Sequence, residues 1–91
     1  MTRRRKENVN LKLGNVIQRY RLRLTDLPST RQGFIEDRSE KLFNHESWIS
    51  EKTLANYECG YNIPTLENLK KLSVALEVDF LELVKEIIAY L

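Results

Sequence analysis

The chain has 91 residues, of which 15 are lysine or arginine and 13 are aspartate or glutamate, so its net charge is +2. This length is enough for one small domain with a modest core and too short for two. No hydrophobic run approaches the roughly 20 residues that a membrane-spanning helix needs, and the single cysteine, Cys59, cannot form an internal disulfide. These features predict a cytoplasmic protein that is not inserted in a membrane.

Positive charge is concentrated at the start of the chain. Residues 1–23 contain eight lysines and arginines and one glutamate, whereas residues 72–91 contain one lysine and four acidic residues. This asymmetry suits a polyanionic partner at the N-terminal side. On charge alone, a solvated tail on an ordinary protein explains it equally well.

The first eight residues form the most basic segment of the chain and have little that could pack on a core. We expect residues 1–8 to be a disordered arm and residues 9–91 to be a single folded domain. Arg3, Arg4 and Arg5 are candidates for contacts with DNA phosphates, with a solubilising tail as the alternative.

Residues 10–24 are predicted to form the first helix of the domain, because hydrophobic residues recur at helical spacing. This stripe consists of Leu13, Val16, Ile17, Tyr20 and Leu24.

A second helix is predicted to begin after Pro28, with Ser29 or Thr30 as its N-cap and Gln32 reaching back to form a capping box with Ser29. Residues 36–43 are compatible with continuing this helix, and residues 44–47 read as a loop. The hydrophobic side chains around this loop are expected to fold back onto the core; they are Leu42, Phe43, Trp48 and Ile49.

The third helix is predicted to start after the N-cap Ser50, to run over residues 51–58 and to end before Gly60. Leu54 and Tyr57 are three residues apart and share one side of this helix. The opposite side is small and polar, which is typical of a helix that contacts a partner through that side.

Two further helices complete the prediction. One begins at Thr65, and its hydrophobic residues are expected to form a broad buried side: Leu66, Leu69, Leu72, Val74, Ala75 and Leu76. The other opens at Asp79, which forms a predicted capping box with Glu82. The chain is therefore predicted to be all-α, a compact five-helix bundle.

The pattern of residues in the second half of the chain resembles the Cro/repressor-type (Xre-like) helix-turn-helix domain, which has the λ-repressor-like fold. The residues that carry this resemblance are Ile49-Ser50, Leu54, Tyr57-Glu58, Gly60, Pro64-Thr65-Leu66-Glu67, Leu69, Lys71-Leu72, Ala75-Leu76-Glu77-Val78 and Leu81. Weaker likeness extends upstream through Leu13-Gly14, Ile17, Tyr20-Arg21, Thr30-Arg31 and Phe34-Ile35, so that it covers residues 13–85.

The resemblance implies a sequence-specific regulator that binds double-stranded DNA. It implies that the helix over residues 51–58 enters the major groove, where Glu51, Lys52 and Asn56 would read base edges. Arg31, at the start of the second helix, would contact a phosphate, with a free surface arginine as the equal alternative. An ion pair between Arg21 and Glu58 would be structural.

Further backbone contacts are expected at the two ends of the reading helix. Thr53 can reach a phosphate or a thymine methyl group. Tyr61 and Asn62 lie in a turn that resembles the family's backbone-binding segment, and they are weaker candidates. For each of these residues a solvated polar side chain is the competing interpretation.

The chain departs from the family between the second and third helices. It has fifteen residues from Ile35 to Ser50 where about half a dozen are usual, and Trp48 stands where the family has a glycine. We interpret this as a lengthened second helix followed by a loop.

The last helix has more hydrophobic residues than one domain face needs. Val84, Ile87, Ile88 and Leu91 are therefore candidates for a homodimer interface. Continuation of the chain into a further domain is the alternative.

No enzyme signature, glycine-rich phosphate loop, cofactor motif or metal-ligand spacing is evident, and the only histidine, His45, is expected in a loop. A competing function is a protein-interaction module, antitoxin-like or an adaptor, that uses this fold without reading bases. Glu51 and the small net charge favour that alternative.

Overall fold

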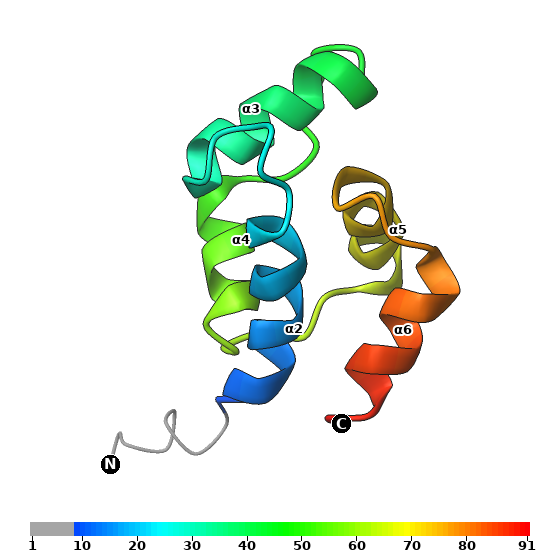
Figure 1. The fold of residues 1–91 in the computed structure, drawn as a ribbon. Coiled ribbons are helices and arrows are strands. Elements are labelled where there is room, and N and C mark those ends of the chain that lie inside the picture. The colour runs from blue at the N-terminus through cyan, green and yellow to red at the C-terminus, as the bar shows by residue number, and fades with distance from the viewer. Residues whose placement is uncertain (1–8) are drawn as a thin grey trace.

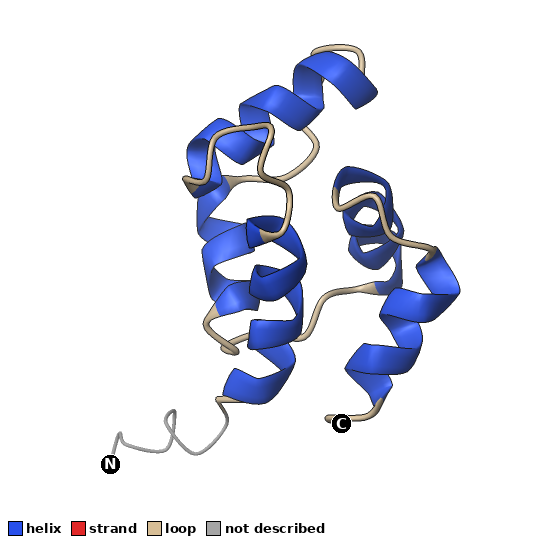
Figure 2. Cartoon of the chain, in the orientation of Figure 1, coloured by secondary structure: helices blue, strands red, loops and turns tan. Residues whose placement is uncertain are grey.

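The computed structural model describes residues 9–91, which form five α-helices and no strand (Figures 1 and 2). The helices are α2 (Leu11–Leu22), α3 (Arg31–Leu42), α4 (Glu51–Glu58), α5 (Leu66–Ala75) and α6 (Phe80–Ile88). The predicted all-α class is confirmed. None of the helices in this part of the chain has the length and hydrophobicity needed to cross a lipid bilayer.

Each helix begins at a polar residue whose side chain accepts a hydrogen bond from a free backbone N–H of the first turn. These N-caps are Asn10, Thr30, Ser50, Thr65 and Asp79. Such caps satisfy donors that have no partner within the helix, and each contributes about 1 kcal/mol. Helix starts were therefore predictable to within a residue or two.

One capping detail differs from the prediction, which allowed Ser29 or Thr30 as the N-cap of α3. Thr30 caps α3, and Gln32 donates a hydrogen bond to Glu36 at 2.7 Å instead of reaching back to Ser29. The predicted Ser29 capping box is wrong, because the Gln32 amide finds a carboxylate one helical turn ahead. Asp79 does cap α6, accepting from the backbone N–H groups of Leu81 and Glu82.

The start of α2 is attached to the end of α4. Gly60 ends α4 with a left-handed φ of +81°, and its carbonyl accepts a hydrogen bond of 2.8 Å from the Asn10 backbone N–H. A Cβ atom at Gly60 would collide with the backbone of Asn10. Glycine is therefore required here for both its conformation and its lack of a side chain.

The core lies where α2 packs on α4 and α6, with α5 against α6 and the first half of α3 closing the remaining side. Its fully buried members come from all five helices: Leu13, Val16, Ile17, Phe34, Leu54, Leu72, Leu76 and Leu83. The predicted stripe on α2 is buried except at Leu24, which is partly buried.

Three hydrophobic residues that were predicted to be buried are exposed. Leu66 is 70% exposed, and Val74 and Leu42 are also largely accessible to solvent. Leu66 is the first residue of α5 and Leu42 the last of α3, where no neighbouring helix covers the terminal turn. The prediction from hydrophobic residues alone therefore made the buried side of α5 too wide.

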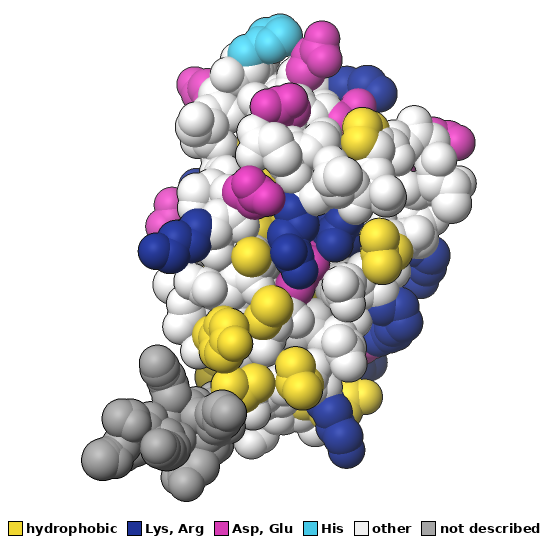
Figure 3. Space-filling view, turned by 90° about the vertical axis from the view of Figure 1, so that its left-hand side faces the viewer, with side chains coloured by type: hydrophobic (Ala, Val, Ile, Leu, Met, Phe, Trp, Pro, Cys, Tyr) yellow, Lys and Arg dark blue, Asp and Glu magenta, His cyan; other side chains and the backbone are white. Residues whose placement is uncertain are grey.

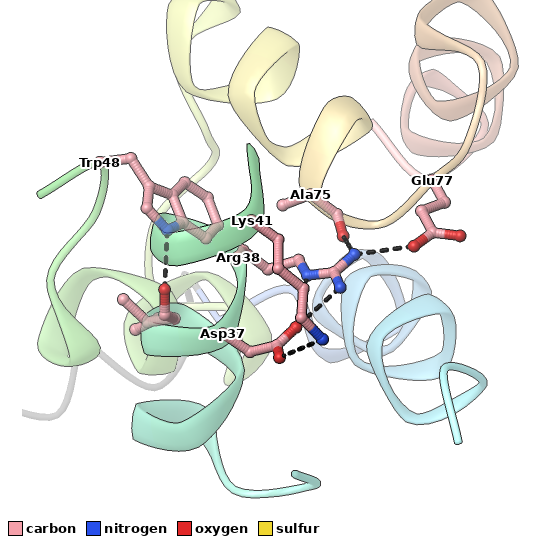
Figure 4. Close-up of polar contacts among 7 residues, drawn as sticks. Asp37, Arg38, Lys41, Trp48, Ala75 and Glu77 are labelled. Atoms are coloured by element: carbon pink, nitrogen blue, oxygen red, sulfur yellow. Dashed lines mark hydrogen bonds and ion pairs between the residues drawn. The ribbon is translucent and has the colours of Figure 1, made fainter. Parts of the chain in front are cut away.

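The enlarged segment between α3 and α4 is folded onto the core through Trp48. Its ring is 5% exposed, stacks on Phe43 with ring centroids 4.9 Å apart and meets Phe34 edge-on at 6.0 Å. The indole N–H donates to the Ile35 carbonyl at 3.1 Å (Figure 4). The predicted burial of Trp48 is confirmed, and Phe43 and Ile49 are partly buried beside it.

A buried arginine holds the added part of α3. Arg38, 4% exposed, donates to Asp37 at 2.7 Å and to Glu77 at 2.7 Å, and it also reaches the Ala75 carbonyl at the end of α5 (Figure 4). Asp37 is paired in addition with Lys41 at 2.9 Å. The lengthened α3 is thus attached to the turn between α5 and α6, an attachment that sequence patterns did not indicate.

Candidate nucleic-acid interface

Helix α4 lies at the surface, packed on one side against α2 and α3. Leu54 and Tyr57 are buried, and the Tyr57 hydroxyl accepts a hydrogen bond of 2.7 Å from the Asn68 amide on α5. Gly14 allows α2 to approach closely, because a Cβ at that position would collide with the Glu58 carbonyl. These contacts fix the rotation of α4 about its own axis.

The fixed rotation turns the predicted reading residues outward. Glu51 and Lys52 are exposed, and Asn56 is half-buried one turn later on the same side. Thr53 is half-buried, and its hydroxyl accepts a hydrogen bond of 2.9 Å from the Ser50 hydroxyl. Lys52 and Asn56 therefore lie one turn apart on the same side of a short, capped helix, and Glu51 is exposed at its start.

The turn after α4 continues this accessible surface. Tyr61, Asn62 and Ile63 are exposed. They line a groove of about 550 Å³ together with Thr53 and Asn10. Figure 3 views the side of the molecule that carries α3 and α4 and shows hydrophobic side chains gathered on its lower part. Ile63 was not among the predicted contacts, although its place directly after Asn62 could have indicated it.

The expected Arg21–Glu58 ion pair is present and buried. The Arg21 guanidinium donates to both carboxylate oxygens of Glu58, at 2.6 and 2.9 Å, and its remaining terminal nitrogen donates to the Ser29 carbonyl. Such bidentate pairing is the strongest form of charged hydrogen bond between side chains. It fixes how α2 packs against the end of α4 and the start of α3.

Arg31 joins the same carboxylate. Its Nε donates to Glu58 at 2.9 Å, and its side chain is 30% exposed. The sequence prediction treated Arg31 as a phosphate contact or a free surface residue. The pairing with Glu58 was missed, because the two residues are 27 positions apart.

A second groove lies at the other end of α4, between that helix and α3. It has a volume of about 520 Å³, and its lining includes His45 and the carboxylates of Glu36, Glu40 and Glu51. His45 is exposed in the loop, as predicted, with a left-handed φ of +64°. The surface around α4 is therefore acidic at the head of the helix and uncharged at the turn that follows it.

Helix α6 has one buried and one exposed side. Ile87 is 2% exposed and belongs to the core, so its proposed place in a dimer interface is wrong. Ile88 and Leu91 are largely exposed, and Val84 is half-buried. The burial of Ile87 follows from its position one turn after Leu83, which is fully buried against α2 and α5.

A polar contact joins α6 to α2 near these residues. The Tyr20 hydroxyl donates to Glu86, whose other oxygen pairs with Arg19 at 3.0 Å. The hydrogen bond to Glu86 and the burial of the ring both raise the pKa of Tyr20. The contact helps to fix α6 against α2.

Two further expectations from the sequence concern the N-terminal arginines and metal binding. Arg3, Arg4 and Arg5 lie outside the described residues. Within residues 9–91, no three or more side chains of His, Cys, Asp or Glu are grouped as metal ligands would be.

Part of the chain matches a known protein family. The family model HTH_3, a helix-turn-helix domain, matches residues 39–83, which is 45 of the 91 residues. No curated protein and no solved structure matches the chain. The matched segment starts in the last part of α3, contains all of α4 and α5, and ends within α6.

Residues 39–83 match a helix-turn-helix domain of the Cro/repressor type. This family comprises DNA-binding regulatory domains and is not a family of enzymes. Within the matched segment, α4 follows the end of α3. The residues between them, 43–50, form a longer connection than the three or four residues usual for the motif.

Proposed function

We propose that the chain is a sequence-specific transcription regulator that binds double-stranded DNA, reads the major groove with α4 and acts as a homodimer. The observation that carries the proposal is the orientation of α4. Its hydrophobic side is locked into the core, while Glu51, Lys52 and Asn56 face outward within a matched helix-turn-helix.

Each outward side chain has a base edge that suits its chemistry. Lys52 donates to guanine O6 and N7, Asn56 forms two hydrogen bonds with adenine, and Glu51 accepts from cytosine N4. These contacts would specify the sequence, since the major groove presents a different donor and acceptor pattern for each base pair.

Contacts to the DNA backbone set the register of α4 in the groove. We assign them to Arg31 at the start of α3, to Thr53 within α4, and to Tyr61 and Asn62 in the turn that follows. The basic arm, with Arg3, Arg4 and Arg5, adds attraction to phosphates that does not depend on sequence. In this arrangement residues 1–8 are the arm and residues 9–91 the DNA-binding domain.

The exposed side of α6 supports the dimer. Leu81, Ile88 and Leu91 are each more than half exposed, with Val84 half-buried beside them. A two-fold axis through this surface would place two α4 helices about one DNA turn, roughly 34 Å, apart on a palindromic site. Ile87 has no part in this interface.

A protein-interaction module remains a second candidate. The observation that favours it is the groove at the head of α4, which three glutamates line and which would face DNA phosphates unfavourably. In that case the exposed surfaces would bind an antitoxin-type or adaptor partner and no base would be read.

The test is selection of DNA from a random pool, followed by fluorescence anisotropy at two salt concentrations. Parent protein is compared with Lys52→Ala and with a deletion of residues 1–8. Lys70→Ala is the matched control, since Lys70 is an exposed lysine on α5 and not on α4. We expect Lys52→Ala to relax one base position at a cost of about 1–3 kcal/mol.

We expect the arm deletion to weaken binding to all sequences alike and to reduce the dependence on salt. Lys70→Ala should behave as the parent does. Weak binding without sequence preference, unchanged by Lys52→Ala, would contradict the proposal. A partner protein captured with little dependence on salt would favour the second candidate.

A further inference from the structure

The Glu58 carboxylate is shared by two arginines that differ in exposure. Arg21 is buried and uses two nitrogens on it, whereas Arg31 is 30% exposed and uses only its Nε, at 2.9 Å. Both oxygens of Glu58 are thereby occupied. Among the residues that the structure describes, the two terminal nitrogens of Arg31 have no hydrogen-bond partner.

The charges of this cluster do not balance. Arg21 and Arg31 contribute two positive charges, and Glu58 contributes one negative charge, so the cluster is left with +1. In a partly buried position this excess is screened less by solvent than it would be on an exposed side chain. The cluster therefore has the electrostatic character of an incomplete site that an anion would complete.

The local sequence of α3 points the same way. Arg31 is the first residue of α3, and the first turn of the helix contains no acidic residue. A cation at this end opposes the helix dipole, at a cost of about 0.3–1 kcal/mol. Departures from a local stability rule are expected mainly at functional positions.

We propose that Glu58 is a positioning residue for DNA binding. It accepts a hydrogen bond from the Nε of Arg31, so that the two terminal nitrogens of Arg31 bind one backbone phosphate. Arg21 in turn holds Glu58. The inference rests on the proposed function and assigns Glu58 a role beyond packing α2 against α4. It also makes the guanidinium shape of residue 31, and not its charge alone, a requirement.

The physical advantage of this arrangement is pre-organisation. A free arginine loses side-chain entropy when it grips a phosphate, and the bond to Glu58 removes part of that loss before binding. Lysine cannot replace it, because its single ammonium group cannot keep Glu58 at one nitrogen and offer a planar pair of donors at two others.

The test compares Arg31→Lys with Arg31→Ala on the selected DNA site. If Glu58 positions the guanidinium, both variants should lose about tenfold or more in affinity, as expected for a charge-assisted contact. Arg19→Lys is the matched control, since Arg19 also pairs with a glutamate but lies on α2 against α6. It should bind as the parent does.

Two readouts separate positioning from general electrostatics. Ethylation of one operator phosphate should weaken the parent and leave Arg31→Lys unaffected, because the contact is already lost. Arg31→Lys should also reduce the slope of log affinity against log salt by about 0.9, the value for one phosphate contact. Full affinity and an unchanged ethylation pattern in Arg31→Lys would overturn the inference while the proposed function stands.

Failure of the parent to select any DNA sequence would overturn the proposed function and the inference together. Glu58→Gln completes a double-mutant cycle with Arg31→Lys, in which the two losses should be far from additive. Glu58→Gln also removes the charge that pairs with buried Arg21. If the Glu58→Gln variant does not fold, the comparison of Arg31→Lys with Arg31→Ala is sufficient by itself.

Discussion

Two buried arginines fix opposite ends of α3. The clusters of charged residues around them differ in net charge. Arg21 holds the start of α3 through the Ser29 carbonyl and Glu58, in a cluster that also contains Arg31. Arg38 holds the added part of α3 near its end. The first cluster has an excess of one positive charge on the side of the molecule that carries α4.

The Arg38 cluster is neutral. Arg38 and Lys41 are matched by the carboxylates of Asp37 and Glu77. Burial lowers the pKa of Arg38, but its hydrogen bonds to the two carboxylates outweigh this effect and raise it. The two arginines therefore have different roles. A cluster with no net charge attaches a helix to the fold, whereas a cluster with excess positive charge can also attract an anion.

The largest effect is expected from Glu58→Gln, which removes the carboxylate that two arginines share. Leaving a buried charge without its partner typically costs about 3–5 kcal/mol of folding stability. Urea unfolding of parent and variant would measure it. Glu86→Gln is the control and should cost about 1 kcal/mol, because its partner Arg19 is exposed. Equal losses in the two variants would contradict the distinction between buried and surface pairs.

Arg38→Met tests the neutral cluster and should cost less, about 2–3 kcal/mol. Methionine fills part of the space, and Asp37 keeps its pairing with Lys41. DNA affinity of the folded protein should not change, since the cluster is balanced and lies apart from α4. A loss of affinity at unchanged stability would show that the end of α3 contributes to DNA binding after all. Lys70→Met, at an exposed lysine outside this cluster, is the control.

Trp48→Phe tests how the added segment is packed on the core. The substitution keeps an aromatic ring beside Phe43 but removes the indole N–H that donates to the Ile35 carbonyl. We expect a loss of about 1–2 kcal/mol, measured by urea unfolding, because a buried hydrogen bond and part of the packing of the ring are lost. A neutral outcome would mean that solvent or another donor replaces the indole.

The smallest effect concerns acid pH. The hydrogen bonds from Lys41 and Arg38 lower the pKa of Asp37 below its ordinary value of 3.8. The folded state therefore holds the ionised form more strongly than the unfolded state does. The resulting stability is fully present above pH 3.8 and is lost as the pH falls through the lowered pKa.

Asp37→Asn should remove this contribution. The stability of the variant should fall less steeply than that of the parent when the pH is lowered below about 4. Parallel curves for the two proteins would show that Asp37 does not contribute to the acid dependence. Asp26→Asn, in the exposed turn after α2, is a suitable control.

Much of the fold was predictable because it depends on neighbours in the sequence. A cap hydroxyl bonds an N–H three residues on, and a hydrophobic stripe repeats every three or four residues. Ser50 and Gly60 therefore bounded α4 correctly, and the burial of Leu54 and Tyr57 followed from their spacing. Lys52 and Asn56 face outward because they lie on the side of α4 opposite to these two buried residues.

The failed predictions of burial and exposure concern the edges of hydrophobic stripes. Leu66 and Ile87 have similar hydrophobic character, yet Leu66 is exposed at the first turn of α5 and Ile87 is buried on α6. Spacing within a helix shows which residues share a side. It does not show how far a neighbouring helix extends over that side.

The sequence by itself determined the number and bounds of the helices and the side of α4 that faces outward, since these depend on hydrogen bonds and periodicity within a few residues. The resemblance implied the Arg21–Glu58 pair, but only the tertiary structure decided which other charges meet. Arg31 reaches Glu58 across 27 positions and Arg38 reaches Glu77 across 39. Such pairs depend on how helices cross, and the excess charge beside α4 becomes visible only once they are packed.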